Sequence, residues 1–211
     1  MPRIPSWRLA AATILLTGLW LAMLLLGAGA TDRAIYEALY AGRSPALVAV
    51  ARLLTALGEP TVLIAAGVLC WLWLWHVGRA RLGFALLMVA LLGRGLSEVQ
   101  KYWIGRLRPD LEAHLVMVKT QSFPSGHATS SMIFYLTLAV VLTTGTRWRR
   151  AAVLAAILLS LLIGTSRVML GVHWPSDVIG GWSFGLLWVL LALRPAERLL
   201  RVDSRGPVIE L

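Results

Sequence analysis

Six long apolar runs limit what this chain can fold into. They cover residues 9–27, 61–77, 82–99, 125–144, 151–165 and 175–193. A helix that crosses a bilayer needs about 20 apolar residues, and only helices or closed barrels satisfy their own backbone hydrogen bonds in lipid. The sequence therefore predicts an all-α fold, a bundle of six transmembrane helices that forms a single domain over residues 1–211.

The composition argues against a soluble, nucleic-acid-binding protein. The net charge of +10 would favour such a role, but only 14% of the residues are charged and 58% are hydrophobic. We therefore expect the bilayer as a partner and no nucleic acid, with the excess arginines in cytoplasmic loops and around an anionic substrate. The single cysteine, Cys70, excludes an intrachain disulfide and a cysteine metal cluster.

The first apolar run leaves two possibilities. Arg3 and Arg8 precede it, and Ala28-Gly29-Ala30 at its end resembles a signal-peptidase site. The run is nonetheless closer in length to a membrane span than to the apolar part of a signal peptide. These features favour a retained helix over a cleaved signal.

Residues 31–59 are not long or apolar enough for another span. Thr31 is expected to cap a short helix that ends at Tyr40, and Ser44-Pro45 reads as the cap and first residue of a second one. The fold prediction thus includes short interfacial helices in the first outer loop. They either lie along the membrane surface or pack over the bundle, where they could form a lid, and the sequence leaves these alternatives open.

The placement of arginine and lysine predicts the orientation. Basic residues are dense at both termini and in the connections at 78–81 and 145–150, whereas the opposite connections carry most of the acidic residues. By the positive-inside rule the first set is cytoplasmic. The prediction is a multi-pass protein of the inner (cytoplasmic) membrane with both termini in the cytoplasm and the segments 101–124 and 166–174 facing the periplasm or exterior.

Three polar stretches on that outer side hold the residues that can do chemistry. They read KYWIGRLRP from Lys101, PSGH from Pro124 and SRVMLGVHWPSD from Ser166. Pro175 suits the first position of a helix, so Asp177 falls in the first turn and His173 lies just before it. A carboxylate at this spacing can bind one imidazole nitrogen and leave the lone pair of the other free for a nucleophile or base.

The same stretches provide groups that bind anions. The start of the helix after PSGH leaves backbone N–H groups unpaired, and Gly126 allows a phosphate to approach them closely. Lys101, Arg108 and Arg167 add three cations, which matches the charge spread over the oxygens of a phosphoryl group in transfer. A capped helix or an arginine at the membrane interface explains any one of these features, but not the full set.

Together the three stretches resemble the signature of the type 2 phosphatidic-acid phosphatase family: Lys, six residues, Arg-Pro; then Pro-Ser-Gly-His; then Ser-Arg, five residues, His, three residues, Asp. The resemblance covers residues 101–177 and implies a membrane lipid phosphatase that needs no metal or other cofactor. It implies that His173 forms a phosphohistidine, that Asp177 orients it and that His127 protonates the leaving oxygen. The residues that it assigns to phosphate binding are Lys101, Arg108, Ser125, Gly126 and Arg167.

The signature residues bind only the phosphoryl group and do not select the lipid. The family includes undecaprenyl-diphosphate, phosphatidylglycerophosphate, phosphatidate and lipid A phosphatases, and Arg106 and Lys119 in the outer connection favour a diphosphate head group. A phosphotransferase that passes the phosphoryl group to an alcohol remains an alternative. So does a non-catalytic lipid-binding or scrambling protein, against which the intact histidines argue, while six spans argue against a soluble haloperoxidase.

Two patterns outside the signature also carry predictions. Arg94 and Glu98 are spaced for an i, i+4 ion pair near the outer end of the third run, where a structural role is expected. Gly181 and Gly185 allow a close helix contact, which we expect within the chain rather than between two copies. The sequence does not predict the oligomeric state.

Overall fold

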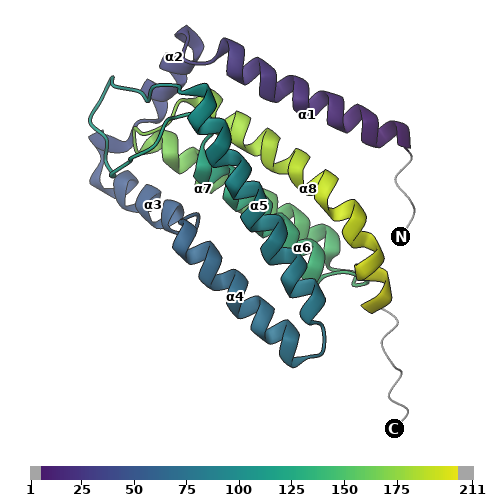
Figure 1. Cartoon of the computed structure of the whole chain (residues 1–211). Helices are drawn as coiled ribbons and strands as arrows, with labels where there is room; N and C mark the ends of the chain where they lie inside the picture. The colour runs from purple at the N-terminus through teal and green to yellow at the C-terminus, as the bar shows by residue number, and fades with distance from the viewer. Residues whose placement is uncertain (1–5, 204–211) are drawn as a thin grey trace.

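The computed structural model describes residues 6–203, with the side chains of residues 6–193. In this part of the chain eight α-helices and one 3₁₀ turn form a bundle, and no strand occurs (Figure 1). The all-α class is therefore confirmed. Arg3 and the arginines beyond residue 193, which contributed to the predicted orientation, lie outside the described side chains.

Six helices coincide with the six predicted runs. They are α1 (Ser6–Leu26), α4 (Pro60–His76), α5 (Ala80–Ile104), α6 (Gly126–Leu142), α7 (Arg149–Met169) and α8 (Pro175–Asp203). Only α1, α5, α7 and the first 19 residues of α8 are long and apolar enough to cross a membrane alone. A fifth span requires α3 (Pro45–Ala56) and α4 together, bent by 42°, and α6 is short at 17 residues. A count of six spans is thus not confirmed.

The outward faces of the long helices are apolar. Leu15 of α1, Leu69 and Trp73 of α4, and Leu154 of α7 all remain exposed. A soluble protein rarely leaves extended apolar faces in water, whereas lipid solvates them without cost. The chain is a multi-pass membrane protein.

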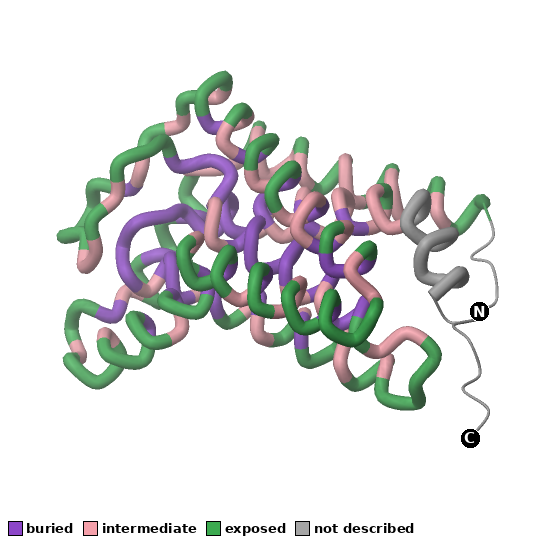
Figure 2. Tube along the Cα trace, turned by 60° about the horizontal axis from the view of Figure 1, so that its bottom comes forward, coloured by how far each residue is buried: buried purple, intermediate pink, exposed green. Residues whose placement is uncertain are grey.

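The centre of the bundle is α6. Twelve of its residues are buried, and it packs against α4, α5, α7 and α8, whereas α1 buries none of its residues and lies on the outside against α8 (Figure 2). A Cβ on Gly181 would lie 2.9 Å from the Ser125 carbonyl oxygen, and one on Gly185 would lie 2.9 Å from Cβ of Met132. The two glycines therefore serve packing within the chain, as predicted, and they hold the start of α8 against the start of α6.

The segment between α1 and α4 contains the expected short helices. They are α2 (Ala30–Leu39), the 3₁₀ turn η1 (Ala41–Arg43) and α3. Ser44 caps α3 as predicted, but the predicted cap at Thr31 is wrong. Gly29 occupies that position, and the carboxylate of Asp32 instead accepts the N–H of Ala28 before the helix. Because α3 packs against α7, this segment covers the bundle.

The connections that carry the motif residues lie at one end of the molecule. The described chain begins in α1 and ends in α8 at the same end of the bundle, while α2 and the long connection from α5 to α6 lie at the other end (Figure 1). Residues 166–178, which join α7 to α8, are all buried except Met169. This arrangement brings the three motif-bearing stretches together.

Candidate active site

His173 is held from both sides of its ring. Its Nε2 lies 3.1 Å from Nη1 of Arg108, and its Nδ1 lies 3.3 Å from the hydroxyl of Ser122. A guanidinium can only donate hydrogen bonds, so Nε2 must be the acceptor and Nδ1 must carry the hydrogen. Nε2 is therefore the nitrogen whose lone pair can attack an electrophile.

The ring of His173 is also kept neutral. It is only 2% exposed. Burial lowers the pKa of His173 well below its ordinary value of 6.5, and the nearby charges of Arg108, Lys101 and Arg167 lower it further. A buried imidazole among cations stays unprotonated at neutral pH, which is the state that a nucleophile requires.

Asp177 lies behind His173 in the first turn of α8, as predicted. The buried carboxylate accepts hydrogen bonds from the Ser122 hydroxyl at 2.5 Å and from the N–H of Trp174 at 2.9 Å. Its direct distance to Nδ1 of His173 is 3.4 Å, which is long for a hydrogen bond. Ser122, which no motif spacing indicated, therefore completes the link between the carboxylate and the ring.

Arg106 is the main correction to the sequence analysis. Its charge suggested a contact with a diphosphate head group, but the guanidinium lies in the interior and pairs with Asp177 at 2.8 Å. It also donates to the hydroxyl of Ser176 and to the carbonyls of Met23 and Leu24 at the end of α1. Arg106 thus joins the first helix to the carboxylate behind His173 and is not available to a head group.

Gly105 separates the two cations of the first motif. Its positive φ of 64° ends α5, so Lys101 lies on the helix and Arg108 on the connection that follows. Both side chains reach the carbonyl of Gln121, Lys101 at 2.8 Å and Arg108 at 3.3 Å. The two cations converge because the connection folds back, and not because they share one helical face.

Arg167 supplies the third cation from the last turn of α7. It is 4% exposed, and its Nη1 donates to the hydroxyl of Thr55 on α3 at 2.7 Å. Its Nε has no hydrogen-bond partner among the described residues. A buried N–H of a charged group is costly to leave unpaired, and a phosphate oxygen would satisfy it.

The start of α6 provides the backbone side of the site. Ser125 is the N-cap, but its buried hydroxyl makes no capping bond within the described chain. The N–H groups of the first turn are thus left for an anion. His127 lies in this turn, and its Nε2 is 2.8 Å from the carboxylate of Glu59 at the start of α4. Glu59 belongs to none of the motifs, so no sequence pattern indicated its role.

These groups surround one cavity of about 370 Å³. The predicted site residues that line it are Lys101, Arg108, Gly126, His127, Arg167 and His173. Asp177 and Ser125 are fully buried and do not reach its wall. Three cations, a helix start and a neutral histidine can together bind a phosphoryl group and attack its phosphorus.

Known proteins resemble this chain in sequence and in fold. The model of the PAP2 superfamily matches residues 80–200. Phosphatidylglycerophosphatase B of Bacillus subtilis is 33% identical over 178 residues, which are 82% of this chain and 87% of that protein. Undecaprenyl-diphosphatase of Sulfolobus acidocaldarius is 32% identical over 133 residues, 61% of this chain and 58% of that protein. The crystal structure of a transmembrane PAP2-type phosphatidylglycerolphosphate phosphatase from Bacillus subtilis matches with a TM-score of 0.82 at 31% identity, covering 88% of this chain and 96% of that one.

Proposed function

The chain belongs to the PAP2 superfamily, and from this premise we propose that it hydrolyses a lipid phosphate or diphosphate through a phosphohistidine at His173. The observation that carries the proposal is the 3.1 Å contact between Arg108 and Nε2 of His173. It supports the tautomer with the lone pair on Nε2, and it brings a guanidinium close enough to bind the oxygens of a phosphate at this nitrogen.

The proposed reaction has two steps. Nε2 of His173 attacks phosphorus, the P–N bond forms as the bond to the lipid oxygen breaks, and His127 gives its proton to that oxygen. The hydrogen on Nδ1, directed to Ser122 and Asp177, stabilises the positive ring. In the second step His127 takes a proton from water, the water oxygen attacks phosphorus, and the P–N bond breaks to release inorganic phosphate.

The phosphate-binding groups act in both steps. In this proposal Lys101, Arg108 and Arg167 bind the non-bridging oxygens together with the N–H groups of the first turn of α6. Ser125 ties the start of α6 to the start of α8, because its N–H donates to the carbonyl of Asp177 at 2.9 Å. Arg108 now contacts the lone pair of Nε2, so its guanidinium turns from the ring to the phosphoryl oxygens when a phosphate enters.

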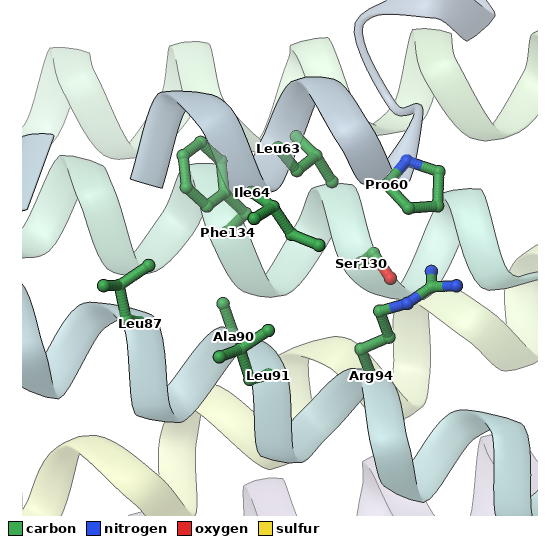
Figure 3. A pocket seen from close by; sticks show the side chains of 9 residues that line it. All are labelled: Pro60, Leu63, Ile64, Leu87, Ala90, Leu91, Arg94, Ser130 and Phe134. Atoms are coloured by element: carbon green, nitrogen blue, oxygen red, sulfur yellow. The ribbon is translucent and has the colours of Figure 1, made fainter. Parts of the chain in front are cut away.

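We infer that the lipid reaches the cavity sideways from the bilayer. An apolar pocket between α4, α5 and α6 adjoins the cavity and shares Pro60 and Arg94 with it (Figure 3). Undecaprenyl diphosphate and phosphatidylglycerophosphate, the lipids named in the relatives, are the first substrates to test, followed by phosphatidate and lipid A.

The proposed topology has six spans, with both termini in the cytoplasm, the protein in the inner (cytoplasmic) membrane and the cavity facing outward. The arginine asymmetry supports it, and the connection from α5 to α6, whose residues line the cavity, lies opposite the end where α1 begins. We also infer that α1 is retained, because its last carbonyls hold Arg106. Cleavage before α2 would remove these acceptors.

Cysteine labelling tests the orientation. In a Cys70→Ala background, cysteine at Thr120 should react with a membrane-impermeant thiol reagent in intact cells, and cysteine at Thr146 should react only after permeabilisation. Both positions are exposed, so access to the reagent depends on the side of the membrane. The reverse pattern would refute the orientation.

Phosphate release from purified lipids tests the reaction itself. We expect the protein in detergent or nanodiscs to release inorganic phosphate from at least one lipid phosphate of the panel, with EDTA present and without any added acceptor. Release that appears only with an acceptor alcohol would identify a phosphotransferase. No release under any condition would refute the proposed function.

A further inference from the structure

The cavity is larger than the phosphoryl site at its inner end. Its volume of about 370 Å³ is within the range of roughly 300–1,000 Å³ found for sites that hold whole small molecules. Lys101, Arg108, Arg167 and His173 line it, and Glu59, Pro60, Arg94 and Glu98, a second set, line it as well. Within the second set Glu59 contacts His127 and Glu98 lies near Gly126, so Pro60 and Arg94 are the members left to face the rest of the substrate.

Arg94 has a unique position in this second set. Among the described side chains, it is the one charged residue that lines both the polar cavity and the apolar pocket. In Figure 3 its guanidinium lies at one end of the apolar pocket, near Pro60 and Ser130, while Leu87 and Phe134 lie farther along. Arg94 thus lies where the head group and the tail of a bound lipid would meet.

The spacing along α5 gives the distance between the two sites. Arg94 precedes Lys101 by seven residues, which places the two on the same face of the helix about 10 Å apart along its axis. Long side chains from two such positions can bind two phosphates of one head group. Arg94 lies on the side toward the apolar pocket, where the group next to the tail belongs.

The ion pair with Glu98 does not account for Arg94. The distance of 3.6 Å is longer than a hydrogen bond, and both side chains are about one third exposed, at 32% and 40%. Pairs of this kind contribute little stability, whereas a charge at the edge of a membrane interior is costly and usually functional. The hydroxyl of Ser130, at the same end of the pocket, has no hydrogen-bond partner in the described chain.

We propose that Arg94 binds a second phosphate of the substrate, located between the phosphate that is cleaved and the lipid tail. A guanidinium presents two parallel N–H groups that match two phosphate oxygens. The apolar pocket has only about 20 Å³ of free space, so the tail lies across its surface, toward the bilayer. This inference rests on the proposed phosphatase function, and it names the preferred class as lipids with two phosphates.

Paired substrates test the assignment of Arg94. Phosphatidylglycerophosphate and phosphatidate with the same acyl chains both end in a phosphate monoester, but only the first carries a second phosphate. In Arg94→Gln we expect KM for phosphatidylglycerophosphate to rise about tenfold, because one charged hydrogen-bonding partner is lost. KM for phosphatidate should change less than about twofold, and kcat should change little for both.

Two further variants separate binding from structure. Arg94→Lys keeps the charge but loses the paired N–H groups, so its KM for the two-phosphate lipid should fall between those of the wild type and Arg94→Gln. Arg147→Gln, in an exposed connection away from the cavity, should match the wild type with both lipids. Melting temperatures in detergent verify that each variant is folded.

The outcomes distinguish this inference from the function on which it rests. Equal losses with both lipids, or no loss with either, would refute the role of Arg94 and leave the phosphatase function intact. A wild-type protein that releases phosphate from no lipid of the panel would refute both. A selective rise in KM for phosphatidylglycerophosphate, partly restored by Arg94→Lys, would support the second-phosphate site.

Discussion

The two histidines of the cavity differ in what surrounds them. His173 is 2% exposed, and side chains from two other segments, Arg108 and Ser122, contact its ring. The side chain of His127 is 15% exposed and contacts the carboxylate of Glu59, whose side chain is 51% exposed. One histidine is buried and held by two side chains, and the other meets a group that a substrate or water can displace.

This difference matches two chemical tasks. A nucleophile needs one tautomer, one direction and no proton on the attacking nitrogen, which fixed, buried neighbours provide. A residue that first gives and then takes a proton must exchange with water between the steps. We therefore expect substitutions near His173 to impair every substrate equally, and substitutions at His127 to impair substrates according to their leaving groups.

The largest expected effect is that of His173→Ala. Removal of the nucleophile should lower kcat/KM by at least about 10⁴-fold for every phosphate ester, since no leaving group compensates for its absence. The measurement is phosphate release from a lipid monoester, a lipid diphosphate and nitrophenyl phosphate. Residual activity that differs between these three substrates would show that another group attacks phosphorus.

The effect of His127→Ala should depend on the leaving group. We expect kcat/KM, which reports the transfer of the phosphoryl group to His173, to fall by roughly 10²–10⁴-fold for a lipid monoester, whose alkoxide needs a proton, less for a lipid diphosphate, and least for nitrophenyl phosphate. The same three assays measure this order. Equal losses in all three would mean that His127 binds phosphate or maintains the structure, and the general acid would have to be another residue.

Arg106→Gln should show a smaller but uniform effect. The variant leaves the buried carboxylate of Asp177 without its ion-pair partner and removes the bonds to the end of α1. We expect kcat to fall by roughly 10–10²-fold for all three substrates, since the loss acts through His173, and we expect the melting temperature to fall as well. A loss confined to lipid diphosphates would instead restore Arg106 as a head-group residue.

The smallest expected effect is a shift in the pH profile. Because burial and three cations lower the pKa of His173, the nucleophile stays neutral as the pH falls through the ordinary histidine range, and it is protonated only at more acidic pH. The acid limb of kcat/KM, corrected for the second ionisation of the substrate, should therefore have its midpoint below about 6.5. A midpoint at or above that value would contradict a buried neutral nucleophile.

The sequence predicted the parts of this molecule that depend on local pattern. Apolar length predicted the long helices, and Pro175 correctly predicted that Asp177 lies in the first turn of α8. The signature assigned the cations and the histidines to one site, and in the structure they line one cavity. The number of membrane spans did not follow from the sequence, because α6 is short and begins with polar residues.

Contacts between distant segments could not be predicted from the sequence. Thr55, Glu59 and Ser122 touch site residues from positions far apart in the chain, and nothing in their local pattern marks them. Arg106 was misread because a charge in a loop looks the same whether it faces a head group or a buried carboxylate. Only the fold-back after Gly105 separates Arg106, which faces inward, from Arg108, which lines the cavity.

The most direct test of the account is whether phosphate becomes bonded to His173. In His127→Ala, nitrophenyl phosphate should still form the P–N bond, while attack by water on it is slowed for lack of a base. Mixing this variant rapidly with ³²P-labelled nitrophenyl phosphate should release one nitrophenolate per active protein in a burst. The label should remain on the peptide that contains His173, stable to alkali and lost in acid. A linear release without a burst, together with no label on that peptide, would contradict the phosphohistidine mechanism.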